Sequence, residues 1–329
     1  MVRFGVRLVA VVAVTALLAT GCTSGTRPDP ASASHSVSSA TEPPDPTTTV
    51  PEVPPSSSAS SAPRSPSSAP QLPLGGRTLL PRYRVVAYYG APANGALGVL
   101  GRWSPDAAAV RIQRTAAQYA GFGRRVQPAM ELIATVAQAS AGPDGRFSAP
   151  MSQAAVARYL AAAHRHKMLL ILDFQPGRGD FLPQVKQYAS FLTDPSVGVA
   201  LDPEWKVGPH QRPARVIGHA SAASINAVGT YLAGIVRSHN LPQKLFVLHQ
   251  FTLSMIPNRS GVARHRELAT VFHADGHGSI ANKRAIYKYL HFPRDAGAGF
   301  KLFFREDPKL MTPLQVMHLT RRPDLITYQ

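Results

Sequence analysis

Short apolar runs alternate with longer alanine-rich stretches of helical period from residue 83 to the end of the chain, and this alternation restricts the fold more than any other feature. It is typical of a parallel sheet whose strands are joined by helical crossovers. We expect eight strands, at residues 84–90, 126–137, 168–176, 197–205, 244–251, 269–276, 299–306 and 324–329. We expect helices at 105–119, 152–166, 180–192, 221–239, 279–290 and 312–319, with a less helical interval after Phe251.

Capping residues mark the starts of several predicted helices. Ser104 and Thr312 each precede a proline, and Ser152 precedes Gln153. Serine and threonine are favoured at helix N-caps, and proline is favoured in the first turn. Eight strands alternating with helices over this length match a (β/α)₈ barrel. We therefore predict an α/β fold, a single TIM-type (β/α)₈ barrel over 83–329.

An open, doubly wound sheet is the alternative fold. Its nucleotide-binding version would carry a glycine-rich phosphate loop or a GxGxxG after a strand. Neither pattern follows any of the predicted strands. Closing eight strands into a barrel is therefore the more economical interpretation.

The N-terminal residues 1–21 have the pattern of a bacterial signal peptide. Arg3 and Arg7 precede the apolar run 8–19, which is too short to span a membrane. Residues 18–22, Leu-Ala-Thr-Gly-Cys, resemble the lipobox, with Ala19 where leucine is usual. The resemblance implies export and acyl chains on Cys22, which would anchor the chain to the outer face of the cell membrane. The alternative is that Cys22 is incidental to a discarded leader.

Residues 22–82 are rich in proline, serine and threonine and contain few large apolar side chains. Such a segment buries too little surface to offset its ordering entropy, so we predict a disordered tether. Apart from the two arginines of the leader, the net charge of +17 falls on the domain, because the tether is neutral. We expect anionic envelope polymers as partners of this basic surface. Nucleic acid is not expected, because the chain is exported and has neither a basic helix nor an aromatic sheet motif.

Polar side chains gather at the ends of the predicted strands, where barrel enzymes carry their reactive groups. They are Tyr88, Tyr89, Glu131, Asp173, Gln175, Asp202, Glu204, Trp205, His249, Gln250, His273 and Asp275. Alternation along a strand points Asp202 with Glu204, Asp173 with Gln175 and His273 with Asp275 in common directions. Charged groups among apolar strands are costly to bury, so these pairs predict a hydrated polar cleft. Each residue alone has a structural alternative, as a helix cap for the aspartates and as a core residue for the histidines.

Asp202 and Glu204 are the predicted catalytic residues. Two carboxylates beside Leu201 and Trp205 would repel each other, which separates their pKa values and keeps one protonated near neutrality. A proton donor beside an ionised carboxylate is what glycosidic cleavage requires. The aromatic faces of Trp205, Tyr88 and Tyr89 are suited to stacking on sugar rings.

The segment Asp202-Pro203-Glu204 resembles the DxE element of barrel glycoside hydrolases, including the family 18 chitinases and the family 25 muramidases. The longer DxxDxDxE string of the chitinases is absent, because residues 197–201 read Val-Gly-Val-Ala-Leu. Only the roles of Asp202 and Glu204 are therefore carried over. The resemblance implies that Glu204 is the general acid and that Asp202 polarises or orients the reacting group.

These observations predict an exported, membrane-anchored glycoside hydrolase that acts on a cell-envelope or environmental polysaccharide and needs no cofactor. The identity of a second catalytic carboxylate stays open among Glu131, Glu306 and Asp307. One alternative is a non-catalytic carbohydrate-binding or wall-organising lipoprotein on the same barrel. The basic segment 264–266 lies outside the strand ends and is assigned to a solvated surface.

A metal-dependent hydrolase is a further alternative. Its ligands would be drawn from Asp173, Asp202, His249, His273 and Asp275. Imidazole and carboxylate groups suit zinc or manganese. The sequence has no HxH after the first strand and no HExxH, so we assign no metal ligands.

Overall fold

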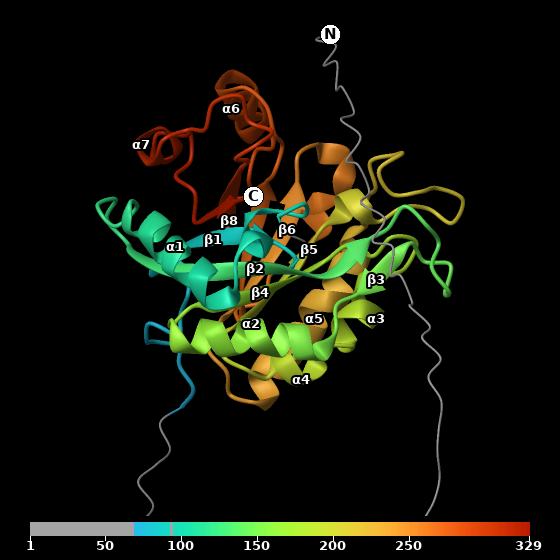
Figure 1. Cartoon of the computed structure of the whole chain (residues 1–329), viewed down its shortest axis with the longest axis horizontal. Coiled ribbons are helices and arrows are strands. Elements are labelled where there is room, and N and C mark those ends of the chain that lie inside the picture. Colours follow the sequence, from blue (N-terminus) through green and yellow to red (C-terminus); the bar gives the residue numbers. More distant parts are fainter. Residues whose placement is uncertain (1–68, 93–94) are drawn as a thin grey trace, which may run out of the picture. The chain divides into compact units, whose positions relative to one another are not determined.

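The computed structural model describes residues 69–92 and 95–329 (Figure 1). The predicted signal peptide, the predicted lipidation site Cys22 and the predicted tether up to residue 68 lie outside the described residues. Within the part that is described, no helix has the length and apolarity needed to cross a bilayer.

Eight parallel strands close into a barrel. They are β1 (Tyr83–Gly90), β2 (Arg125–Ala137), β4 (Leu169–Phe174), β5 (Val197–Leu201), β6 (Lys244–Gln250), β7 (Leu268–Ala274), β8 (Gly297–Leu302) and β9 (Leu325–Tyr328). Each pairs in parallel with its neighbour in chain order, and β1 pairs with both β9 and β2, which closes the ring. The short β3 (Ser148–Pro150) extends β2 as an antiparallel partner. The predicted barrel is confirmed, and the open sheet is excluded.

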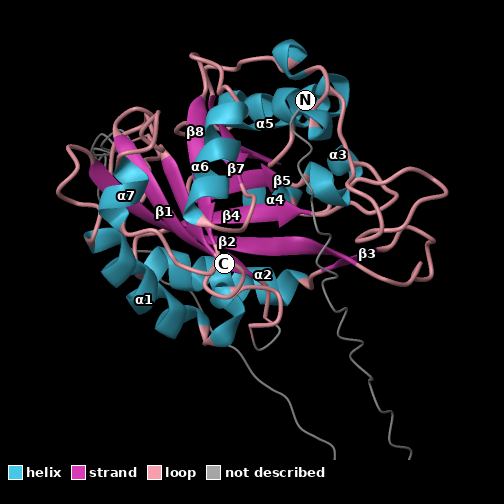
Figure 2. Cartoon of the chain, turned by 90° about the horizontal axis from the view of Figure 1, so that it is seen from above, coloured by secondary structure: helices cyan, strands magenta, loops and turns pink. Residues whose placement is uncertain are grey.

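Helices lie around the outside of the strands (Figure 2). They are α1 (Pro105–Ala117), α2 (Gln153–Arg165), α3 (Phe181–Lys186), α4 (Ala189–Leu192), α5 (Ala222–Ser238), α6 (Ile280–Tyr289) and α7 (Pro313–Met317). The predicted caps form: the side chains of Ser104 and Ser152 accept from backbone amides three residues later. Thr312 forms a reciprocal capping box with Gln315. The helix expected over 180–192 is divided into α3 and α4.

The connection between β6 and β7 differs from the other strand-to-strand connections of the barrel. It contains two single 3₁₀ turns, Leu253–Met255 and Arg259–Gly261, and no α-helix. This agrees with the weak helical pattern after Phe251. The chain therefore passes from β6 to β7 through an irregular segment.

The interior of the barrel is apolar in its lower part. Buried Val85, Ala129, Ile171 and Val247 belong to one cluster that also includes Leu79, from the segment that precedes β1. Leu72 joins the same cluster. Residues 69–82, which were expected in the tether, therefore pack against the barrel, and the folded domain begins before residue 83.

Candidate active site

One polar side chain from each of the eight barrel strands, or from the residue directly after a strand, lies in the layer above the apolar interior. We call these residues the polar layer: Tyr89, Glu131, Asp173, Asp202, His249, His273, Lys301 and Thr327. Each lies two residues beyond an inward-facing apolar or glycine position, such as Ala87 before Tyr89, and period-two alternation points it inward as well. The carboxyl ends of all eight strands therefore meet in a single polar centre.

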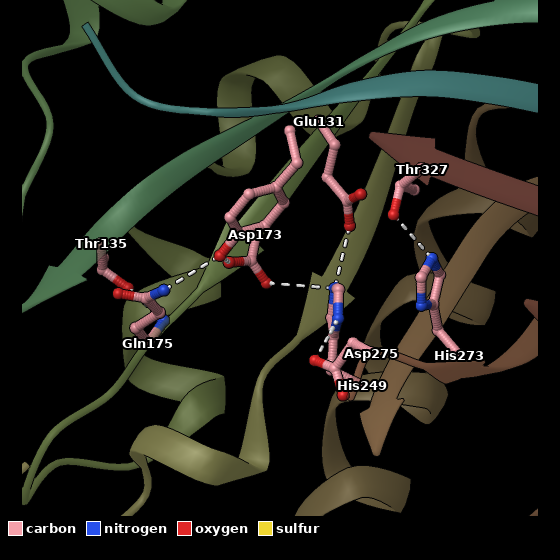
Figure 3. Close-up of polar contacts among 9 residues, drawn as sticks. Glu131, Thr135, Asp173, Gln175, His249, His273, Asp275 and Thr327 are labelled. Atoms are coloured by element: carbon pink, nitrogen blue, oxygen red, sulfur yellow. Dashed lines mark hydrogen bonds and ion pairs between the residues drawn. The ribbon is translucent and has the colours of Figure 1, made fainter. Parts of the chain in front are cut away.

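His249 lies at the middle of this layer, between two carboxylates (Figure 3). Its Nε2 is 2.9 Å from Oε1 of Glu131, and its Nδ1 is 3.0 Å from Oδ2 of Asp275. Burial acts to lower the pKa of His249, but its charge interactions and hydrogen bonds with Glu131 and Asp275 outweigh burial and raise that pKa well above its ordinary value. The ring is therefore an imidazolium held between two acids.

Tyr89 connects two of the predicted site residues. Its hydroxyl donates to Oδ2 of Asp173 over 3.0 Å and accepts from Nε2 of Gln175 over 3.0 Å. The ammonium of Lys301 lies 3.5 Å from the centroid of the Tyr89 ring. Asp173 of β4 and Gln175, the residue directly after that strand, thus share one partner, as their i and i+2 spacing predicts.

His273 lies beside His249 at the same register of the neighbouring strand, and the ring centroids are 4.9 Å apart. Its Nε2 is 2.9 Å from Oγ1 of Thr327. Burial first, and then the positive charges of His249 and Lys301, lower the pKa of His273 well below its ordinary value. Gly299 of β8 faces the His273 ring, and a Cβ atom added to Gly299 would lie 2.8 Å from Cδ2 of that ring. A glycine is needed at this point for the His273 ring to fit.

The two deeply buried aspartates are pushed toward their neutral forms. Burial raises the pKa of Asp173 to about 7, although the nearby charges of His249 and Lys301 oppose this effect. Burial also raises the pKa of Asp202 well above its ordinary value, with further increases from Asp173 and Asp275. Burial and the neighbouring acids therefore favour the neutral form of Asp202.

Glu204 joins the same cluster by a route that the sequence did not predict. β5 ends at Leu201, and Pro203–Trp205 form a 3₁₀ turn, so strand alternation does not set the direction of Glu204. Burial, and then the charge of Asp275, raise the pKa of Glu204 to about 7. Glu204 is half-buried, whereas Asp202 is 2% exposed. Glu204 lies near Asp202, as expected. Of the two acids, Glu204 is the one that reaches solvent.

Several buried polar atoms of the cluster have no hydrogen-bond partner. They are Oε2 of Glu131, Oδ1 of Asp173, Oδ1 of Asp202, Oδ1 of Asp275 and Nδ1 of His273. Buried polar atoms are nearly always paired, so these atoms are open positions for a hydroxyl group or water. The cluster therefore has hydrogen-bonding capacity that its own side chains leave unused.

No family model, curated protein or solved structure matches this chain.

Two predicted site residues point away from the polar layer. The Tyr88 hydroxyl lies 2.8 Å from Oγ1 of Thr115 in α1, and its ring packs against Trp103 on the outer face of the barrel. Gln250 accepts from Nη1 of Arg259 and donates to the carbonyl of Thr252. Tyr88 precedes the inward-facing Tyr89, and Gln250 follows the inward-facing His249, so strand alternation points both side chains outward. We therefore remove Tyr88 and Gln250 from the site.

The three acids considered as a second catalytic carboxylate, Glu131, Glu306 and Asp307, lie in different environments. Asp307 accepts from the backbone amides of Gly278 and Phe303 and pairs with Lys283 at 3.0 Å, which is a structural role. Glu306 is exposed at a different rim position. Glu131 is bonded to His249. Asp275 is the acid whose charge raises the pKa of Glu204, and Oδ1 of Asp173 lies 3.9 Å from Nε2 of His249.

The metal-dependent alternative gains no support. Among residues 69–92 and 95–329, no group of three or more His, Cys, Asp or Glu side chains is arranged to hold a metal ion. Both ring nitrogens of His249, the central candidate ligand, lie against carboxylates.

Sequence reasoning missed Lys301 and Thr327. The run at 299–306 drew attention to the acids at its end, whereas β8 ends at Leu302. The signal that could have found Lys301 is its alternation with the small inward residues Gly297 and Gly299. Thr327 has no comparable signal, because a threonine in an apolar strand is common.

Proposed function

We propose that the chain is an exported, lipid-anchored glycoside hydrolase that acts on a cell-envelope or environmental polysaccharide, with Glu204 as the general acid. The observation that carries the proposal is that Glu204 is half-buried at the edge of a cluster of acids and that its pKa is raised to about 7. A carboxyl group that keeps its proton near neutrality can give it to the leaving oxygen of a glycosidic bond.

The neighbouring acids supply the remaining roles. Burial raises the pKa of Asp202, which favours its neutral form, and its unpaired Oδ1 would orient Glu204 or a sugar hydroxyl. Asp173 or Asp275 would act as the second carboxylate of the reaction, either on a water molecule or on the sugar carbon. The positive charge of His249 lies between Glu131 and Asp275 and reduces the electrostatic repulsion among the acids.

Few side chains of the site are exposed enough to contact a large substrate. Asp173, Asp202 and His249 are buried, whereas Glu204 and Trp205 are half-buried. A polysaccharide would therefore contact the rim at Glu204 and stack on Trp205, and a sugar substituent would reach toward the polar layer.

The test is sugar release from chitin oligosaccharides and peptidoglycan fragments by the purified full-length chain. Glu204→Gln should abolish release, and wild-type turnover should fall as the pH rises through about 7, because Glu204 then loses its proton. Glu306→Gln is the matched control, since Glu306 is an exposed acid away from the polar layer, and it should retain full turnover. Full turnover in Glu204→Gln would refute the assignment of the acid.

A non-catalytic carbohydrate-binding protein is the second candidate, favoured by the burial of Asp202. Glycosidases need two carboxyl groups that flank the scissile bond. Asp202 is 2% exposed, so of this pair only the half-buried Glu204 can reach a substrate at the surface. In this case the same oligosaccharides would bind saturably without product. Trp205→Ala would weaken binding, and Glu204→Gln would leave it unchanged.

A further inference from the structure

A cavity of about 490 Å³ lies on the side of the barrel, against the irregular connection between β6 and β7. It is lined by Leu253, Ile256, Pro257, Arg259, Ser260, Val262 and Arg264 from that connection and by Pro293 and Asp295 from the segment between α6 and β8. Its volume falls in the range of small-ligand sites. Most of the lining comes from the connection that contains 3₁₀ turns where the other connections have an α-helix.

Two arginines converge at this cavity. The guanidinium groups of Arg259 and Arg264 lie 5.4 Å and 5.2 Å from the centroid of the same ring, that of the buried Phe272. Burial, and then the positive charge of Arg264, lower the pKa of Arg259. The positive charge of Arg264 disfavours the charged form of its neighbour Arg259, and a bound anion would offset this effect.

The side chains that line the cavity carry an unbalanced charge. Asp295 is the only acidic residue among them; it pairs with Nε of Arg264 at 3.2 Å, and its own side chain is 65% exposed. Two guanidinium groups against one carboxylate leave one positive charge. The other walls, among them Leu253, Ile256 and Val262, are apolar.

We propose that this cavity is a binding site for a small monoanionic oxyanion with an apolar body, such as a phosphodiester or a carboxylate. The protein holds both guanidinium groups in place: Arg259 donates to Gln250 and to the carbonyl of His291, and Arg264 donates to the carbonyl of Val262. Their remaining N–H groups hold the oxyanion, and the aliphatic walls hold the apolar part. The site lies outside the polar layer, so its ligand is distinct from the substrate of the proposed hydrolase. The basic segment 264–266, expected to be a solvated surface, is thus divided: Arg264 faces the cavity, and Arg266 is exposed.

The test is calorimetric titration of the full-length chain with three probes: dibutyl phosphate, hexanoate and the uncharged tributyl phosphate. We expect dibutyl phosphate or hexanoate to bind, and the tighter of the two identifies the headgroup. Tributyl phosphate has the same apolar groups without the charge and should bind at least tenfold more weakly.

Arg264→Gln should weaken binding of the anionic probe at least tenfold. Arg266→Gln is the matched control, because the Arg266 side chain is 91% exposed two residues away, and it should change binding less than twofold. Thermal unfolding of both variants checks that they fold, and Leu253→Ala, which removes part of the apolar wall, should weaken binding as a second, independent variant. Equal binding of tributyl phosphate, equal effects of the two arginine variants, or no binding of either anion would overturn the proposal.

Discussion

His249 and His273 lie side by side at one register of β6 and β7, and their pKa values are displaced in opposite directions. Both rings are buried, so burial disfavours the cation in each. His249 has two carboxylate partners, whereas His273 has the hydroxyl of Thr327. The partners decide the outcome: one ring is charged, and that charge helps to keep the other neutral.

Replacing His249 with glutamine should destabilise the protein by about 3–5 kcal/mol, because Glu131 and Asp275 lose their buried cation. The folded-state pKa of His249 lies above its unfolded value, so its stabilisation is complete below pH 6.5 and declines as the pH rises toward the folded value. Urea unfolding between pH 6.5 and 9 should therefore show a loss of stability in the wild type that is smaller in His249→Gln. Parallel pH profiles would contradict a charged His249.

Glu204→Gln should change stability in a pH-dependent way. The folded-state pKa of Glu204 is about 7 against an ordinary value of 4.5, so the folded chain keeps a proton that the unfolded chain releases, and stability is lost as the pH rises through 7. The variant should match the wild type at pH 4 and exceed it by at most roughly 3 kcal/mol at pH 8. Chemical unfolding at the two pH values measures this difference, and Glu306→Gln should show none.

Gly299→Ala should destabilise the barrel by about 1–3 kcal/mol, because the new methyl group would collide with the His273 ring at 2.8 Å. Gly234→Ala is the matched control. Gly234 lies in α5 with open space around its Cα, so this substitution should stabilise the helix by up to about 1 kcal/mol. Equal unfolding midpoints for the two variants would show that the ring has room to move.

Tyr88→Phe and Tyr89→Phe test the alternation along β1. Each removes a hydroxyl and should cost about 1 kcal/mol, Tyr88 through Thr115 and Tyr89 through Asp173 and Gln175. The hydrogen bond from Tyr89 lowers the pKa of Asp173, so only Tyr89→Phe should raise that pKa further. Following the Asp173 carboxyl carbon by NMR during a pH titration measures the shift. An equal shift in the pKa of Asp173 in both variants would show that Tyr88 belongs to the site.

The strands were predictable because their signal is local. Each buried strand has a continuous apolar run of its own, and the caps at Ser104, Ser152 and Thr312 depend on contacts three residues apart. Barrel closure followed from the number of strands and their alternation with helices. The polar residues at the ends of β2, β4, β6 and β7 were recognised because charged groups are conspicuous in apolar runs.

Local pattern failed where an element ended early. The run that includes Glu204 was treated as one strand, yet β5 ends at Leu201, and a 3₁₀ turn directs Glu204. Tyr88 and Gln250 were grouped with their inward-facing neighbours, although successive residues of a strand face opposite sides. Residues 69–82 were assigned to the tether although they contain four leucines, whereas residues 23–68 contain none. The packing of Leu72 and Leu79 shows that they belong to the domain.

The sequence by itself determined the barrel, its helices and the presence of acids and histidines at the strand ends, because these depend on hydrophobic periodicity and capping over a few residues. The tertiary structure decided which of those groups meet. His249 contacts Glu131 across 118 positions of sequence and Asp275 across 26, and Lys301 and Thr327 join the same layer. Protonation states follow from these long-range contacts and from burial, because charge interactions depend on distance in space and not on distance along the chain.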